Sequence, residues 1–189
     1  MIIEKNKISH AADQLRKGNM IIYETDTLYG LGADAMNSKA IEKINILKKR
    51  QTPLSIIVRS IDDINKYAIL PKKHKKFINS ILPGCFTILL NAKESKLSHL
   101  VQQSSDKIGI RIPDNDFCFK LLQKFKNPII TTSVNVHGQK ALNNIDDIDK
   151  IFFNIPIYSG FVNQNSKGST ILDLSKNSVK IIRQGDGKI

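Results

Sequence analysis

The sequence lacks tryptophan, has only two cysteines, Cys85 and Cys118, and contains no long apolar run. Two cysteines without a C-x-x-C spacing do not make a disulfide framework, so we expect free thiols in a reducing compartment. No run approaches the ~18 apolar residues that a membrane helix needs, and the first residues carry no signal-peptide pattern. We therefore expect a cytoplasmic protein with no membrane partner.

Several well-known chemical signatures are also missing. The sequence has neither the G-x-x-x-x-G-K-S/T loop nor a G-x-G-x-x-G turn after a strand, and it has no G-x-S-x-G elbow. Its four histidines are scattered without the spacing of metal ligands, and no cysteine accompanies them. We expect no zinc site, and nothing marks a Ser-His-Asp triad.

Positive charge is in clear excess. Lysine and arginine total 29 against 17 acidic residues, which gives a net charge of +12. One interpretation is a polyanionic partner such as RNA or a nucleotide, and the other is a lysine-rich proteome that places lysine on every surface. The basic run at residues 72–76 is open to the same two interpretations, an RNA contact or a solvated helix face.

Apolar runs and helical patterns alternate along the chain, which is typical of the α/β class. We expect one domain over residues 1–189, a twisted, open, mixed sheet with helices packed on it. Helices are expected at 9–17, 38–50, 72–82, 117–125 and 145–152, with a short one after Ser60. Strands are expected at 20–23, 54–58, 86–90, 108–112, 128–132, 169–174 and 179–182, with the last pair forming a hairpin.

Polar side chains gather where two of these strands end. They are Thr25, Asp26, Thr27 and Tyr29 after one strand, and Thr131, Thr132, Ser133 and Asn135 around the end of another. Ligands of open α/β sheets bind at the carboxyl ends of strands, where hydroxyls and amides can contact phosphate, ribose or carboxylate. The alternative is ordinary turn chemistry, because the same residue types are common wherever a strand ends.

Three basic side chains each have more than one interpretation. Lys48 and Arg50 close a helix, where cations favourably meet the helix C-terminus; they can equally clamp a phosphate. Arg111 lies inside an apolar strand, so it needs solvent, an internal carboxylate or an anionic ligand. Asp173 also lies inside an apolar strand, so its negative charge raises the same question of what balances it.

Seven segments, in order along the chain, resemble motifs of one family. They are ETDTLYGLG (24–32), LKKR (47–50), LPGCFT (82–87), IGIRIP (108–113), TSVNVHG (132–138), STILD (169–173) and IRQG (182–185). These are similar to P-T-D/E-T-x-Y-G-L-G, L-K-x-R, W-P-G-P-L-T, V-x-V-R-x-P, S-A-N-x-S-G, S-T-V-x-D and L-R-x-G of the YrdC/TsaC family, the L-threonylcarbamoyladenylate synthases. The resemblance covers essentially the whole chain and matches the short form, without the C-terminal domain of some relatives.

The resemblance implies a YrdC-like fold with a large basic cavity. It implies an enzyme, a nucleotidyltransferase that joins L-threonine, bicarbonate and ATP (with Mg²⁺ on the phosphates) into threonylcarbamoyl-AMP and pyrophosphate. The product would feed threonylcarbamoyladenosine modification of tRNA through downstream transferase proteins. Residue by residue, the resemblance implies catalysis by Lys48 and Arg50, ATP binding by Lys48, Arg50, Asn135 and Arg183, and L-threonine binding by Thr27, Arg111, Ser133 and Ser169. Asn143 joins the ATP set by spacing alone, and Thr52 joins it as a replacement for a loop contact.

This chain departs from the family pattern at several positions. Glu24 replaces a proline and adds negative charge near the expected anion site, and Val134 and His137 replace small residues. Only Gln51 and Thr52 separate Arg50 from the next Pro-Leu pair, where relatives have about four residues, so a nucleotide contact of the longer loop is either missing here or replaced by Thr52. Two other functions stay open: a non-catalytic relative that binds tRNA or double-stranded RNA, and an enzyme that adenylates a carbamoyl group from carbamoyl phosphate.

Overall fold

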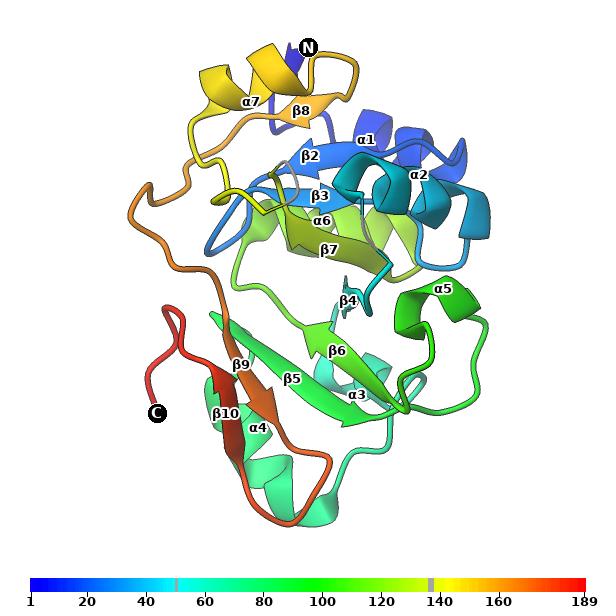
Figure 1. The fold of residues 1–189 in the computed structure, drawn as a ribbon, viewed down its shortest axis with the longest axis vertical. Coiled ribbons are helices and arrows are strands. Elements are labelled where there is room, and N and C mark those ends of the chain that lie inside the picture. The colour runs from blue at the N-terminus through cyan, green and yellow to red at the C-terminus, as the bar shows by residue number, and fades with distance from the viewer. Residues whose placement is uncertain (50, 136–137) are drawn as a thin grey trace.

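One ten-stranded mixed sheet runs along the longest axis of the molecule (Figure 1). The computed structural model describes residues 1–49, 51–135 and 138–189. The strands are β1 (Ile2–Ile3), β2 (Ile21–Tyr23), β3 (Gly30–Gly32), β4 (Ser55–Ile57), β5 (Phe86–Asn91), β6 (Lys107–Arg111), β7 (Ile129–Ser133), β8 (Ile157–Tyr158), β9 (Thr170–Asp173) and β10 (Lys180–Arg183).

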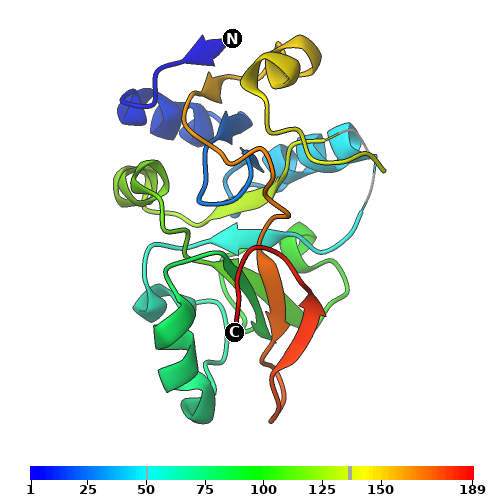
Figure 2. The same cartoon turned by 90° about the vertical axis from the view of Figure 1, so that its left-hand side faces the viewer.

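Helices lie on both sides of this sheet (Figure 2). They are α1 (Ile8–Arg16), α2 (Ser38–Lys48), α3 (Ile61–Ile64), the 3-10 turn η1 (Lys72–His74), α4 (Lys75–Ile81), α5 (His99–Gln102), α6 (Asp116–Phe125) and α7 (Ile145–Ile151). In the described part of the chain no helix is both long and apolar enough to cross a membrane.

The strand order is β1-β8-β2-β3-β7-β4-β6-β5-β9-β10, so the two ends of the sheet do not meet. Parallel pairs (β1–β8, β8–β2, β4–β6, β5–β9) alternate irregularly with antiparallel ones (β2–β3, β3–β7, β7–β4, β6–β5, β9–β10). The sheet is therefore mixed and open, as the sequence predicts.

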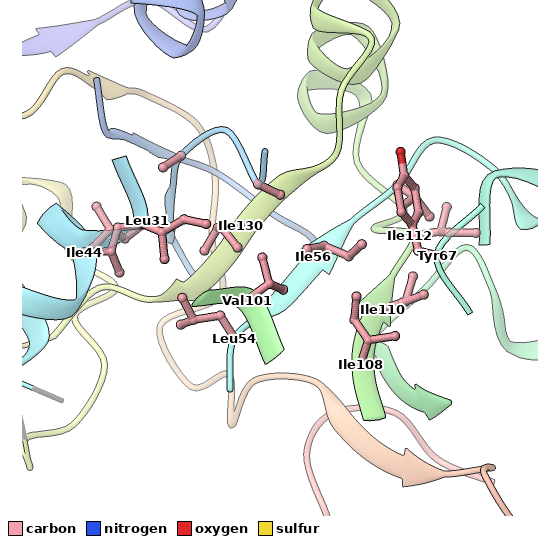
Figure 3. Close-up of a cluster of buried hydrophobic side chains, with 14 of the residues drawn as sticks. Leu31, Ile44, Leu54, Ile56, Tyr67, Val101, Ile108, Ile110, Ile112 and Ile130 are labelled. Carbon is pink, nitrogen blue, oxygen red and sulfur yellow. The ribbon is translucent and has the colours of Figure 1, made fainter. Parts of the chain in front are cut away.

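The two faces of the sheet carry separate apolar clusters. Successive strand side chains point to opposite faces, so neighbouring Ile56 and Ile57 belong to different clusters. Helices α1 and α6 cover one face, where Leu15 and Leu121 pack near Tyr23. The other face is covered partly by α2, whose Ile44 lies with Leu31, Ile130 and Ile56 in the cluster drawn in Figure 3.

Most elements follow the local signals closely. Asn37, Ser60, Asn115 and Asn144 each accept a hydrogen bond from the first turn of the helix that follows, as N-caps do. Helices α2 and α7 are thus capped by Asn37 and Asn144. The last two strands form the expected antiparallel pair, with an irregular register between Ile181 and Arg183.

Three expectations need correction. The 72–82 helix begins as a 3-10 turn, and α4 itself starts at Lys75. The helix expected to run through residue 50 ends at Lys48, because Lys49 takes the left-handed conformation at φ 48° that closes a helix. The segment 30–32, taken from sequence only as part of a loop motif, is strand β3 between β2 and β7.

Candidate functional site

A polar cavity of about 280 Å³ opens on one face of the sheet. Its size is close to the lower end of small-molecule sites, roughly 300 Å³. The lining residues come from the β2–β3 loop, from seven strands and from the segments beside them: Thr25, Thr27, Leu28, Tyr29, Gly30, Pro53, Leu54, Ser55, Thr87, Arg111, Thr131, Thr132, Ser133, Ser169, Ile171 and Arg183. This described lining includes two arginines and no carboxylate, so the cavity favours an anionic ligand.

Strand register brings the distant wall residues to one face. Ser55 of β4 pairs with Thr131 of β7, and Thr87 of β5 pairs with Ile171 of β9. Because side chains alternate along a strand, Thr131 and Ser133 point to the same side. The period-two pattern that builds the core therefore also gathers hydroxyl groups from strands far apart in sequence.

Glycine at two wall positions allows this close packing. Gly30 lines the cavity directly, so no side chain fills the space there. At Gly109 a Cβ atom would lie 2.5 Å from the Ser55 Oγ atom, a contact that real Cβ atoms essentially never make. The strands β4 and β6 keep their spacing because position 109 has no side chain.

Arg111 is the most informative side chain of the site. It is 7% exposed, and its Nη2 group donates to Asp26 Oδ1 at 2.7 Å and to Thr27 Oγ1 at 3.1 Å. Asp26 also accepts from the Asp114 amide at 3.2 Å, which fixes the carboxylate. The Arg111 Nε group is buried without a hydrogen-bond partner in the described structure. The internal-carboxylate interpretation of this arginine is confirmed, and its role toward an anionic ligand stays a prediction for a residue that lines the cavity.

Ser169 and Arg183 form the opposite wall. Arg183 donates from Nη2 and Nε to the Ser169 carbonyl oxygen, at 2.6 and 3.3 Å, and from Nη2 to Ser169 Oγ at 3.3 Å. Burial and then the charge of Arg111 lower the pKa of Arg183 from its usual value. Two guanidinium groups thus act on the same cavity, which strengthens its attraction for anions.

Lys48 does not line the cavity but is hydrogen-bonded to residues at its rim. This last residue of α2 is 2% exposed, and its Nζ group donates to the Ser133 carbonyl oxygen at 2.8 Å and to Asn135 Oδ1. Ser133 Oγ donates to the same Asn135 oxygen at 2.9 Å. Lys48 therefore holds the end of β7 and the Asn135 side chain together at the rim of the cavity.

Glu24 does not act on the cavity. Its carboxylate, 8% exposed, accepts from the Phe161 amide at 2.9 Å and lies 4.0 Å from Lys5 Nζ. Tyr29, which does line the cavity, donates to the Gly160 carbonyl oxygen at 2.7 Å. We call residues 159–163 the strap, since this segment is fastened to the β2–β3 region on the way to β9. The added negative charge expected near the anion site is thus turned toward the strap.

The predicted site residues do not all meet in the cavity. Thr27, Arg111, Ser133, Ser169 and Arg183 line it, and Lys48 and Asn135 adjoin it through hydrogen bonds. Thr52 is exposed and absent from the lining, although Pro53 follows directly. Asn143 instead donates to Asn163 of the strap at 3.4 Å, and its own Oδ1 atom is buried without a partner among the described residues. Arg50 and His137 lie outside the described residues.

Two polar wall residues, Thr87 and Ser55, escaped the sequence-based assignment. Thr87 stands in the quoted segment at 82–87, and its hydroxyl lies 2.7 Å from that of Ser169. The alternation of the strand after Pro83 could have identified Thr87 as the polar residue among apolar neighbours. Nothing local marks Ser55, because its role depends on its pairing with Thr131 and Gly109.

The described residues contain no group of three or more His, Cys, Asp or Glu side chains that could hold a metal ion. The Asp26 carboxylate, which neighbours the cavity through Arg111, is engaged by Arg111 and by the Asp114 amide. A divalent ion that enters with a nucleotide would be held mainly by phosphate oxygens and water, as Mg²⁺ usually is.

Residues 13–185 match the family model Sua5_yciO_yrdC, described as "Telomere recombination". The chain belongs to the Sua5/YciO/YrdC family. A Methanocaldococcus jannaschii relative, named "Putative threonylcarbamoyl-AMP synthase", is 36% identical over 185 residues, which span 96% of this chain and 86% of that protein. A Bos taurus family member named "Threonylcarbamoyl-AMP synthase" is 30% identical over 93% of this chain and 66% of its own length.

Solved structures of this Sua5/YciO/YrdC family superpose well on the fold. Pyrococcus abyssi Sua5 in complex with L-threonine has a TM-score of 0.89 at 26% identity, covering 98% of this chain but 57% of the Sua5 chain. The chain thus spans little more than half of that protein. Escherichia coli YciO matches with a TM-score of 0.88 at 22% identity, over 100% of this chain and 95% of its own, which supports the fold alone.

Proposed function

We propose that the protein is an L-threonylcarbamoyladenylate synthase, which joins L-threonine, bicarbonate and MgATP into threonylcarbamoyl-AMP and pyrophosphate. Family membership and relatives named as threonylcarbamoyl-AMP synthases support this activity. The observation that carries it in the structure is Arg111, a buried cation with an unpartnered Nε group beside a cavity whose described lining contains no carboxylate. Asp26 and Thr27 are contacted by the Nη2 group of Arg111, so a carboxylate of an amino acid ligand would bind through the other donors of this guanidinium.

The proposed reaction balances without a covalent enzyme intermediate. The threonine amine, once deprotonated, adds to CO₂ formed from bicarbonate, and a carbamate oxygen then attacks the α-phosphorus of ATP as the bond to pyrophosphate breaks. Negative charge grows on the leaving pyrophosphate, so fixed cations at the phosphates favour the transition state. Holding the two substrates in line can supply up to ~7–11 kcal/mol.

We divide the cavity into two parts. Thr27, Arg111, Ser133 and Ser169 would bind threonine, with the Arg111 guanidinium on its carboxylate. ATP would lie toward Lys48, Arg50, Asn135 and Arg183, with Mg²⁺ carried on its phosphates. Lys48 and Arg50 are the proposed catalytic cations. Thr52 and Asn143 are the weakest members of the proposed ATP set, because neither lines the cavity.

Release of pyrophosphate from MgATP, L-threonine and bicarbonate tests this activity. We expect turnover that requires all three substrates. Turnover without threonine, or none at all, would overturn the proposal, and turnover with carbamoyl phosphate in place of threonine and bicarbonate would favour the other adenylating activity. Arg50→Ala should mainly raise the KM for ATP, and Arg111→Ala the KM for threonine. Arg111→Lys, which keeps the charge without the two-pronged geometry, is the matched control for folding.

Binding of tRNA through a basic surface is the finer part of this proposal. The surface consists of Lys72, Lys73, Lys75, Lys76, Lys176 and Lys180, all exposed. His74 Nε2 lies 2.9 Å from the Lys176 carbonyl oxygen, and Lys73 bonds to Asn177, so two distant segments form one patch. Replacing Lys73, Lys75 and Lys76 by glutamate should weaken tRNA binding and flatten its salt dependence by about one unit of slope per lost phosphate contact. An unchanged salt slope would place any tRNA contact elsewhere.

The cellular setting remains proposed as well. A cytoplasmic location suits the two free cysteines and the proposed tRNA-directed product, which downstream transferase proteins would consume.

A further inference from the structure

Two buried hydroxyl groups face each other on the cavity wall. Thr87 of β5 is 3% exposed and Ser169 is 5% exposed, and both line the cavity. Their oxygen atoms lie 2.7 Å apart, a normal length for a hydrogen bond between hydroxyls. Arg183 donates to Ser169 Oγ at 3.3 Å from the other side.

Counting protons shows what this pair can offer a ligand. The arginine can only donate, so Ser169 Oγ acts as an acceptor toward it. One of the two hydroxyl protons is spent between Thr87 and Ser169, in whichever direction that bond runs. The pair therefore keeps one proton to donate and still has lone pairs to accept. A substrate hydroxyl, which also donates once and accepts, is the group that satisfies both.

The neighbours of Thr87 across the sheet complete a three-part surface. In the antiparallel pair β5–β6, Ile88 lies opposite Ile110, so Thr87 comes next to Arg111. In the parallel pair β5–β9, Thr87 lies beside Ile171, which also lines the cavity. Adjacent strands are about 4.8 Å apart. The Arg111 guanidinium, the Thr87–Ser169 hydroxyl pair and the Ile171 side chain therefore lie on neighbouring strands. A single amino acid ligand can reach from one of these groups to the next.

We infer that Thr87 and Ile171 determine which amino acid side chain the site accepts. With the carboxylate at Arg111, Thr87 and Ser169 bind the β-hydroxyl group, and Ile171 contacts the γ-methyl group. This inference rests on the proposed function, since it assigns the side-chain selectivity of the same cavity. It predicts discrimination against valine through Thr87, against serine through Ile171, and against L-allo-threonine through both, because that diastereomer exchanges the hydroxyl and methyl positions.

The test compares kcat/KM for L-threonine, L-valine, L-serine and L-allo-threonine by pyrophosphate release. Thr87→Val keeps the shape but removes the hydroxyl, so kcat/KM for threonine should fall roughly 10- to 100-fold, mainly through KM, while that for valine does not fall. Thr87→Ser should restore most of the preference for threonine over valine. Ile171→Ala should reduce the preference for threonine over serine by roughly 10-fold or more. Thr87→Val with Ile171→Thr should shift the preference toward L-allo-threonine.

Thr170→Val is the matched control for losing a buried hydroxyl. Thr170 is fully buried beside Ser169, and its hydroxyl donates to Gly187, away from the cavity lining. It should lower the melting temperature and leave the threonine-to-valine ratio unchanged. If wild-type protein turns over threonine but Thr87→Val keeps the wild-type ratio, the inference is wrong while the proposed function stands. If wild-type protein has no threonine-dependent turnover, the proposed function itself fails.

Discussion

Glu24 and Gly160 form a contact whose energy can be worked out from the structure. A Cβ atom built on Gly160 would lie 1.9 Å from Glu24 Oε2 and 2.0 Å from its carboxyl carbon. The same carboxylate accepts the Phe161 amide. Gly160→Ala must therefore push the strap and the carboxylate apart. We expect a loss of about 1–3 kcal/mol in the free energy of unfolding from overpacking, plus about 1–3 kcal/mol if the amide bond breaks.

Removing the carboxylate should remove the clash. Glu24→Ala alone should cost about 1–3 kcal/mol, because the Phe161 amide loses its acceptor. In that background the new Cβ of Gly160→Ala has room, and we expect it to cost under about 0.5 kcal/mol. The coupling between the two changes then amounts to at least about 1 kcal/mol, well above the error of additivity for independent sites.

Urea unfolding followed by circular dichroism measures all four members of this cycle. Glu24→Gln is the matched control, since it removes the charge but keeps the volume, so Gly160→Ala should remain costly beside it. Additive losses within about 0.5 kcal/mol would refute the steric argument. A rescue by Glu24→Gln as large as that by Glu24→Ala would show that charge, and not space, decides the contact.

Three further predictions concern other parts of the chain. Lys48→Met removes the Nζ group that donates to both Ser133 and Asn135, so the free energy of unfolding should fall by about 1–3 kcal/mol. The kcat/KM for ATP should fall as well, and unchanged kinetics would exclude Lys48 from the ATP site. Burial alone would raise the pKa of Asp173, but hydrogen bonds from Lys107 and Ser175 outweigh it and lower the pKa from 3.8 to about 2. Its contribution to stability is therefore complete only above about pH 5 and is lost progressively as the pH falls to about 2 and below, and acid titration of Asp173→Asn should lack that component. Burial raises the pKa of Cys85 to about 11, so iodoacetamide should label it far more slowly in native than in unfolded protein at pH 8; equal rates would contradict the burial argument.

The elements that sequence predicted well carry their signals locally. In α6 the Asn115 cap and the buried side chains of Phe117, Leu121 and Phe125 all lie within a few residues of one another. Strands β1 and β8 are two residues long and exist because they pair with each other and with β2. No local pattern could reveal such short strands, because their stability comes from partners far away in the chain.

Strand β3 and Glu24 show why some local signals mislead. Glycine is a poor strand former, yet Gly32 lies where a Cβ atom would meet Tyr23 at 2.7 Å and the Ile130 carbonyl oxygen at 2.9 Å, so packing requires glycine there. Glu24 has its main partner, the Phe161 amide, far along the chain. Sequence alone placed its charge near the anion site because only the neighbours in the chain were visible.

The candidate site residues divide in the same way, into those that a matched motif identified and those whose place depends on contacts distant in the sequence. Thr27, Arg111, Ser133, Ser169 and Arg183 were assigned by matching motifs, and the fold places them in one cavity. The shortened loop after Arg50 suggested Thr52, and spacing alone suggested Asn143; neither argument contained the strand pairing that decides which side chains reach the cavity. Their roles toward ATP stay predictions, as do those of the other site residues.

The wall of the cavity is spread along the chain from Thr25 to Arg183. During synthesis, therefore, a nascent chain that has not yet released Ser169 and Arg183 from the ribosome has Arg111 but no opposite wall. Such an intermediate, or a fragment truncated before β9, should neither compete for substrate nor gain stability from it. Substrate binding would thus report that the chain has emerged past Arg183 and that the last strands have docked.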